Sequence, residues 1–304
     1  MRALSAHPAA ADRHTPPTPL APSLPLPGGT RLSGVATMVG SALSNQTGAA
    51  IGSLAFPVLG PVGVVAVRQY VAAIVLVAVG RPRPRTFTRR QWWPVLLLAL
   101  VFGTMNLSLY TAVDRVGLGL AVTLEFLGPL GIALAASRRR ADVCCAAVAV
   151  AGVVTLMRPR PSADFLGMGL ALLAACCWAA YILLNRTVGR RIPGAAGPAA
   201  AAAVSALVFL PVGLAVVVRH PPTPAAVGYA VAAGVLSSAV PCLADLFTLR
   251  RVTAPAFGLF MSVNPVLAGL AGWLVLGQGL GWPEWAGIGA VVAANALSMR
   301  VSRT

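Results

Sequence analysis

A chain of 304 residues that is 58% hydrophobic and only 10% charged does not have the composition of a soluble domain, in which about 25% of residues are charged. The net charge of +16 reflects 23 basic residues that are all arginine, and they fall in short clusters between apolar runs rather than along one basic, aromatic-rich surface. The composition therefore excludes a soluble protein, argues against nucleic-acid binding and predicts an all-α polytopic membrane protein.

The chain begins with a segment, residues 1–33, that is rich in proline, alanine and serine. This segment has neither the apolar core nor the cleavage site of a signal peptide, so a disordered cytoplasmic tail is expected. Beyond it, apolar stretches recur at about the 20 residues that a membrane-spanning helix needs. Ten spans are predicted, at 34–55, 59–80, 93–113, 116–136, 141–157, 165–186, 198–218, 225–248, 255–276 and 283–299.

Cysteine and histidine give no sign of a metal site. The five cysteines lie within apolar runs, and the three histidines lie in the tail or in a loop. These cysteines are interpreted as small buried hydrophobic residues. The sequence therefore predicts no disulfide framework, no metal ion and no cofactor.

Arginine is distributed unevenly between alternate loops. With the N-terminus inside the cell, fifteen arginines fall in cytoplasmic loops and the C-terminal tail, and only four fall in outer loops. Membrane proteins show this bias towards the cytoplasm, and it would be lost if one helix were miscounted. Both termini are therefore expected in the cytoplasm.

The sequence contains an internal repeat. The stretch DRVGLGLAVTLEFLGPLG at 114–131 resembles RRVTAPAFGLFMSVNPVLAG at 250–269, and the pairs Arg115/Arg251 and Pro129/Pro265 are both 136 residues apart. Because the repeat unit contains an odd number of helices, five, the second copy must enter the membrane with the opposite orientation. Inverted repeats, here expected at 34–157 and 165–299, are typical of secondary transporters whose site lies between the halves.

Two acidic residues, Glu125 and Asp245, lie inside predicted spans. A charge at the centre of a spanning helix costs about 2.5–3.5 kcal/mol on insertion scales, so such a residue is expected to face the protein interior. One interpretation is a structural carboxyl that is protonated or hydrogen-bonded between helices. The interpretation that we favour for Glu125 is a functional group that binds a proton or an amine.

Three prolines mark expected helix breaks at membrane depth, namely Pro129, Pro241 and Pro265. Pro129 has no N–H to offer the carbonyl of Glu125, and Pro241 likewise frees the carbonyl of Ser237. Broken backbone at this depth is tolerated only where it is buried in protein or lines a wet cavity. A simple hinge is the alternative role for each proline.

Further polar and aromatic side chains recur at helical spacing, on faces that are expected to meet in one cavity. Trp and Tyr near helix ends are more often interfacial anchors, which is the alternative for the aromatic members. Arg68, inside the second span, either reaches towards the membrane surface or provides a counter-charge for a carboxylate substrate. The other expected cavity residues are Asn45, Asn106, Tyr110, Trp178, Tyr181 and Asn264.

Several stretches together resemble the EamA-type drug/metabolite transporters, closest to the threonine/homoserine exporter branch, over nearly all of residues 34–298. They are FPVLGPVGVVAVRQYVAA, GTMNLSLY, LGLAVTLEFLGPLGIALAASRRRADV, CCWAAYILLNR and LSSAVPCLADLFTLRRVTAPAFGLFMSVNPVLAGLAG. The resemblance implies ten helices in two inverted repeats and export of small metabolites across the bacterial inner membrane. The chain departs from the branch at Gly52, Asn264 and Gln278, where lysine, an acidic residue and glutamate are typical.

These features predict an inner-membrane exporter of threonine- or homoserine-like amino acids, or of related small metabolites, driven by proton exchange and acting as a monomer or homodimer. Glu125 is the expected proton or amine site, and Asp245 is expected to gate or couple near the cytoplasmic end. A drug or nucleoside exporter of the same superfamily is the alternative. A lipid-modifying enzyme would need clustered acidic and histidine groups or a metal motif, which the sequence lacks.

Overall fold

A computed structural model describes residues 28–135, 148, 151–152, 164–219, 221–241 and 254–301, and every regular element in these ranges is helical. The first half contains α1 (Gly28–Ser53), α2 (Phe56–Gly80), the 3₁₀ turn η1 (Pro84–Thr86), α3 (Arg89–Val116), α4 (Leu118–Glu125) and α5 (Leu127–Ala135). The second half contains α7 (Phe165–Arg191), α8 (Ala196–Arg219), α9 (Pro224–Gly234), the π-helical turn η2 (Val235–Ala239), α11 (Ala254–Leu276) and α12 (Trp282–Val301). The predicted span at 141–157 lies almost wholly outside the described residues.

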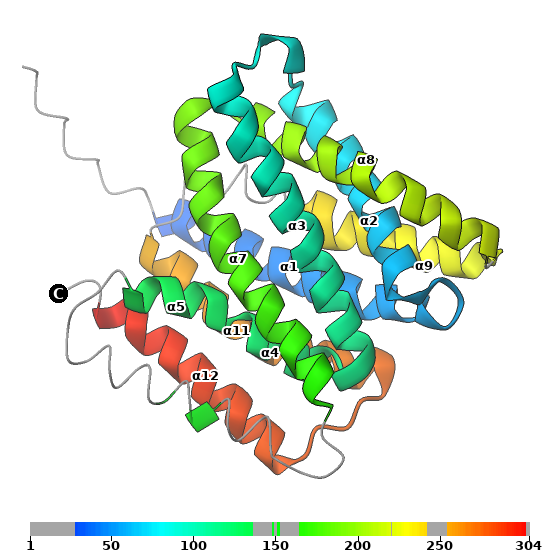
Figure 1. Ribbon diagram of the computed structural model, residues 1–304. Helices are drawn as coiled ribbons and strands as arrows, with labels where there is room; N and C mark the ends of the chain where they lie inside the picture. The colour runs from blue at the N-terminus through cyan, green and yellow to red at the C-terminus, as the bar shows by residue number, and fades with distance from the viewer. Residues whose placement is uncertain are drawn as a thin grey trace, which may run out of the picture.

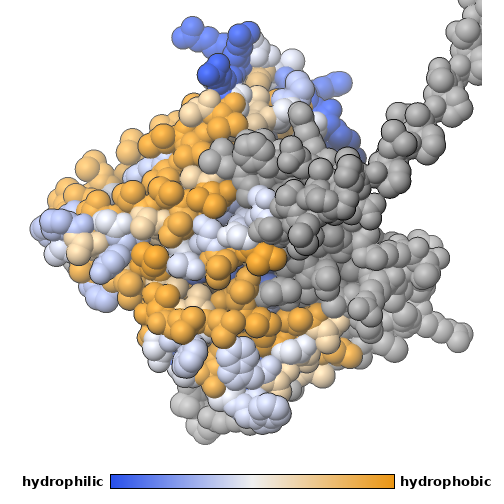
Figure 2. All heavy atoms as spheres, turned by 180° about the vertical axis from the view of Figure 1, so that it is seen from behind, coloured by the Kyte–Doolittle hydropathy of each residue, from blue (hydrophilic) through white to orange (hydrophobic). Residues whose placement is uncertain are grey.

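The outer faces of the helices are apolar. Among the described helices, α2, α3, α7 and α8 are long and apolar enough to cross a membrane, by length and composition. Large hydrophobic side chains such as Ile74, Leu100 and Leu207 are exposed on these helices. The coloured part of the face in Figure 2 is largely hydrophobic, and its most hydrophilic residues gather at the top. This surface suits contact with lipid rather than water, and it fits the polytopic membrane protein expected from composition.

The helices pack in pairs that join the two halves of the sequence. α3 lies along α7, and α2 lies along α8 (Figure 1). With the offset of 136 residues, α1 corresponds to α7, α3 to α9 with η2, and α4 with α5 to α11. In agreement with this, α1 packs on α9 and η2 as α7 packs on α3, and α1 packs on α11 as α7 packs on α4 and α5. Two five-helix repeats related by a two-fold axis would produce such matched contacts, because each contact then has an equivalent in which the two halves are interchanged. The ten-helix count and the repeat boundaries stay predictions, because most residues between α5 and α7 lie outside the described part.

Polar contacts tie α3 to α7 at both ends. At one end, the Gln91 amide Nε2 donates to the main-chain carbonyl of Arg191 at 2.8 Å. At the other end, Arg115 Nε forms an ion pair with Asp164 Oδ2 at 2.8 Å. The turn after α3 and the start of α7 therefore lie at the same end of the molecule, as the predicted topology requires. The side of the membrane that this end faces stays a prediction.

The helix break expected near Pro129 is present, whereas α11 runs through Pro265 without interruption. A proline removes one backbone hydrogen bond, and a helix can continue as a kinked element when packing holds both parts. Close packing against α7 accompanies the break near Pro129. Gly128 lies so near α7 that a Cβ there would overlap the carbonyl oxygen of Ala175. α5 is thus seated directly on the backbone of α7.

Helix α4, which ends at Glu125, is held by a residue from the other half of the chain. Seven of its eight residues are buried, and its N-cap is Gly117, a glycine at φ 84° that has no side chain to cap the helix. Gln278, in the loop after α11, accepts a hydrogen bond from the main-chain N–H of Leu118 at 3.0 Å through Oε1. The second half therefore positions the helix that carries Glu125.

Candidate functional site

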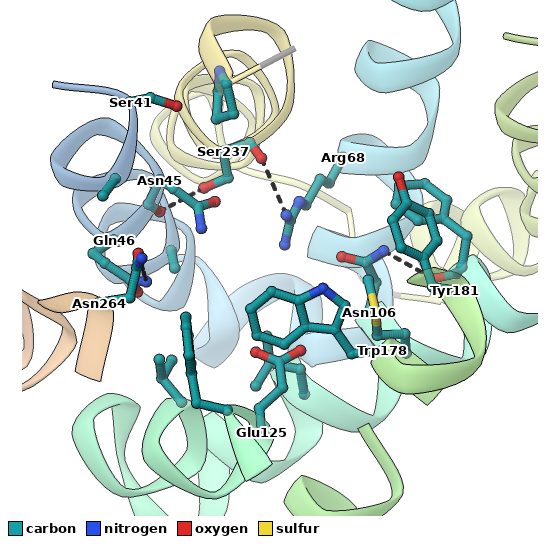
Figure 3. Close-up of a pocket in the computed structure, with 18 residues that line it drawn as sticks. Ser41, Asn45, Gln46, Arg68, Asn106, Glu125, Trp178, Tyr181, Ser237 and Asn264 are labelled. Atoms are coloured by element: carbon teal, nitrogen blue, oxygen red, sulfur yellow. Dashed lines mark hydrogen bonds between the residues drawn. The ribbon is translucent and has the colours of Figure 1, made fainter. Parts of the chain in front are cut away.

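A cavity of about 270 Å³ lies where the two halves meet. Small-molecule pockets span about 300–1,000 Å³, so this cavity suits a small solute. Its walls come from α1, α2, α3, α4, α7, η2 and α11, and Figure 3 draws the 18 lining residues and labels ten of them. The polar lining residues are Ser41, Asn45, Gln46, Arg68, Asn106, Glu125, Ser237 and Asn264, and the aromatic ones are Phe102, Phe126, Trp178 and Tyr181.

The structure brings most of the predicted site residues to this cavity. Of the three predicted helix-break prolines, Pro241 lines it and Pro129 and Pro265 do not. Two of the other predicted residues also differ from the expectation. Tyr110 does not line it, because its ring lies beneath Arg68 and packs edge-on against Phe56, which leaves Tyr110 only 1% exposed. Asp245 lies outside the described residues. The predicted residues that do line the cavity are Asn45, Arg68, Asn106, Glu125, Trp178, Tyr181, Pro241 and Asn264.

Glu125 is the last residue of α4 and is 6% exposed, with its side chain directed into the cavity below Trp178 (Figure 3). Its carboxylate makes no hydrogen bond or ion pair with the residues that the structure describes. A buried carboxylate without a partner is unfavourable, and binding a proton or a cation neutralises it. Its place at the negative C-terminal end of the helix adds to the attraction for a cation.

Arg68 lies in the middle of α2 and turns towards the protein interior. Its Nε donates to Ser238 Oγ at 3.3 Å, and its Nη2 donates to the carbonyl oxygen of Ser237 at 3.2 Å. This carbonyl is the one that Pro241 leaves without a helical N–H partner. The guanidinium carbon also lies 5.1 Å from the centre of the Tyr110 ring, within cation–π range. The alternative in which Arg68 reaches towards the membrane surface is therefore wrong.

An amide pair forms another part of the wall. Gln46 Nε2, from α1, donates to Asn264 Oδ1, from α11, at 3.3 Å. Gln46 was not among the predicted cavity residues, although it directly follows Asn45 in a polar stretch of an apolar span. Ser41 and Asn45 lie about one turn apart on the same side of α1, while Gln46 lies about 100° further round the helix. The side of α1 that faces the cavity is therefore wide enough to include all three residues.

The cavity wall carries two charges of opposite sign, on Arg68 and Glu125. They do not form an ion pair with each other, and the one ion pair within the described ranges is that of Arg115 with Asp164. No cluster of His, Cys, Asp and Glu that could hold a metal ion is found in the same ranges. The cavity can therefore offer one cationic and one anionic contact to a small solute, beside amide and aromatic groups.

Comparison with known proteins supplies the family context. The EamA-like transporter family matches residues 165–300. Over 255 residues the chain is 34% identical to the threonine/homoserine exporter RhtA of Escherichia coli (strain K12) and to that of Salmonella typhimurium (strain SL1344), covering 83% of this chain and 86% of each relative. A solved crystal structure superposes with a TM-score of 0.59 at 19% identity, over 90% of this chain and 98% of the other. That last likeness concerns the fold alone.

Proposed function

The chain belongs to the EamA-like transporter family, and we propose that it exports threonine- or homoserine-like amino acids, or related small metabolites, across the bacterial inner membrane in exchange for protons. Membership confirms the resemblance seen in the sequence, and it makes the protein a transporter rather than an enzyme. The named activity of the relatives supports amino acids as the substrate class. We place both termini in the cytoplasm on the arginine distribution.

The observation that carries the proposal is the buried Glu125 carboxylate, which lines the cavity and makes no hydrogen bond or ion pair with the described residues. A proton and the ammonium group of an amino acid both neutralise a buried carboxylate, so they compete for it. If one carboxylate carries the amine outwards and the proton inwards, the two movements are linked without a second ion site. Proton entry would then drive export of the amine.

The alternative is a drug or nucleoside exporter of the same superfamily. Four aromatic side chains on the cavity wall, Phe102, Phe126, Trp178 and Tyr181, favour a flat aromatic solute. The small volume and the two opposite charges favour a small charged one. A resistance screen that overexpresses the protein against toxic amino-acid analogues and aromatic antibiotics separates the two classes.

The test of the proposal is Glu125→Gln, which keeps the shape of the side chain and its hydrogen-bonding capacity but does not titrate. In proteoliposomes, the variant is expected to insert and unfold like the wild type, yet to lose transport of L-threonine or L-homoserine driven by a pH gradient. Glu284→Gln is the matched control, because Glu284 lies in the first turn of α12 and does not line the cavity. Wild-type transport by Glu125→Gln would reduce Glu125 to a structural group.

A further inference from the structure

We propose that Arg68 binds the carboxylate of the substrate, and that η2 holds its guanidinium ready for this contact. The inference rests on the proposed function and names the chemical feature that the site recognises. A substrate would place its carboxylate on Arg68 and its ammonium group on Glu125. The preferred substrates would then be small zwitterions rather than simple amines.

Within the described part of the chain, the hydrogen bonds of Arg68 leave part of its guanidinium unused. The group carries five N–H donors in a planar fork, and carboxylates bind such a fork through two parallel hydrogen bonds. Contacts with Ser238 Oγ and the Ser237 carbonyl use Nε and one hydrogen of Nη2. The remaining donors, on Nη1 and Nη2, make no hydrogen bond with the described residues. Figure 3 shows the group between Ser237 on one side and the space above Trp178 and Glu125 on the other.

The turn that holds Arg68 is itself fixed to α1. Ser237 Oγ donates to the main-chain carbonyl of Asn45 at 2.9 Å, and Ser44 Oγ donates to that of Leu236 at 2.8 Å. Single π-helical turns occur frequently at functional sites. Because α1 anchors η2 through both bonds, the contacts of Arg68 rest on a supported piece of backbone rather than on a free loop.

Tyr110 supports the guanidinium from another direction. Its ring is buried, lies 5.1 Å from the guanidinium carbon and is fixed in turn by Phe56. Holding the guanidinium in place before the substrate arrives reduces the entropy lost on binding. A neutral amide could satisfy the Ser237 carbonyl equally well, so this contact alone does not explain a charge in the middle of a spanning helix. An anionic group of the substrate would give this charge a partner and would explain its position.

The experiment compares L-threonine with L-threoninol, in which a hydroxymethyl group replaces the carboxylate. Transport of both is measured in proteoliposomes for the wild type, Arg68→Gln and Arg68→Lys. Arg219→Gln is the matched control, because Arg219 is the exposed last residue of α8 and does not line the cavity. The readout is the ratio of kcat/KM for L-threonine to that for L-threoninol, which a general loss of folded protein does not change.

The wild type and Arg219→Gln are expected to prefer L-threonine strongly. Arg68→Gln should raise the KM for L-threonine by about 10- to 100-fold, the effect of losing hydrogen bonds between charged groups, and should leave the KM for L-threoninol nearly unchanged. Arg68→Lys keeps the charge but not the fork, so its ratio should fall between that of the wild type and that of Arg68→Gln. If Arg68→Gln does not fold, the ratio of Arg68→Lys decides by itself.

A wild-type ratio near one, or a ratio that neither Arg68 variant changes, would overturn the assignment. In that event, transport of L-threonine driven by a pH gradient in the wild type would show that the proposed function still holds. Absence of any amino-acid transport in the wild type would overturn the proposed function, and this inference with it.

Discussion

Replacing Gly128 with alanine tests whether α5 rests directly on the backbone of α7. A Cβ at this position would overlap the carbonyl oxygen of Ala175 and would lie 2.9 Å from its carbonyl carbon and 3.2 Å from its Cα. The obstacle is backbone, which cannot rotate away as the end of a flexible side chain can. α5 must therefore move away from α7 to accept the extra methyl group.

The structure provides a matched control in the same helix. Adding a methyl group to a close-packed contact costs typically about 1–3 kcal/mol, and we expect Gly128→Ala to lower the free energy of unfolding by this amount. A Cβ on Gly131 would meet nothing within 4 Å. Gly131→Ala should therefore keep or slightly raise stability, because alanine favours a helix by up to about 1 kcal/mol over glycine.

Thermal unfolding of both variants in one detergent measures this difference, and transport in proteoliposomes measures its consequence. Phe126, at the break between α4 and α5, packs edge-on against Trp178 of α7 with ring centres 4.6 Å apart. A displaced α5 should disturb this contact beside Glu125 and reduce the transport rate. The reasoning is refuted if Gly128→Ala unfolds at the same temperature as Gly131→Ala.

Three further predictions follow from the topology, the prolines and the cap of α7. Reporter fusions should place both termini and the 81–90 loop in the cytoplasm, and a periplasmic C-terminus would contradict the ten-helix count. Pro129→Ala should yield folded protein with impaired transport, and Pro265→Ala should have a smaller effect because α11 is already continuous; normal transport by both would leave the prolines as packing residues. The Gly167 N–H and Arg115 hold the pKa of Asp164 below its ordinary value of 3.8, so the ionised carboxylate stabilises the fold above that pH and the effect is lost as the pH falls through the lowered pKa. Asp164→Asn should therefore unfold at a lower temperature than the wild type at pH 7, with a difference that shrinks below pH 3.8; an equal difference at both pH values would contradict this.

The sequence by itself determined that lipid surrounds the helices of this protein, and it identified several candidate functional residues. The near absence of charge within the apolar runs required lipid around the helices, and the cost of a carboxyl in that setting singled out Glu125. The chemistry of proline predicted that Pro241 would leave the carbonyl of Ser237 without a helical partner. These conclusions depend on residue types and on spacing within one helix, and a single chain segment contains that information.

Only the tertiary structure decided which helix faces meet. Helical spacing placed Asn106 and Tyr110 on one face of α3, yet Tyr110 is covered by Arg68 while Asn106 lines the cavity. The partner of Arg68 lies 169 residues further along the chain, and no local pattern connects the two. The rotation of each helix about its own axis is set by close contacts between distant segments, such as Gly128 against α7. Because such contacts depend on the shapes of both partners at once, they emerge only when all the helices are packed together.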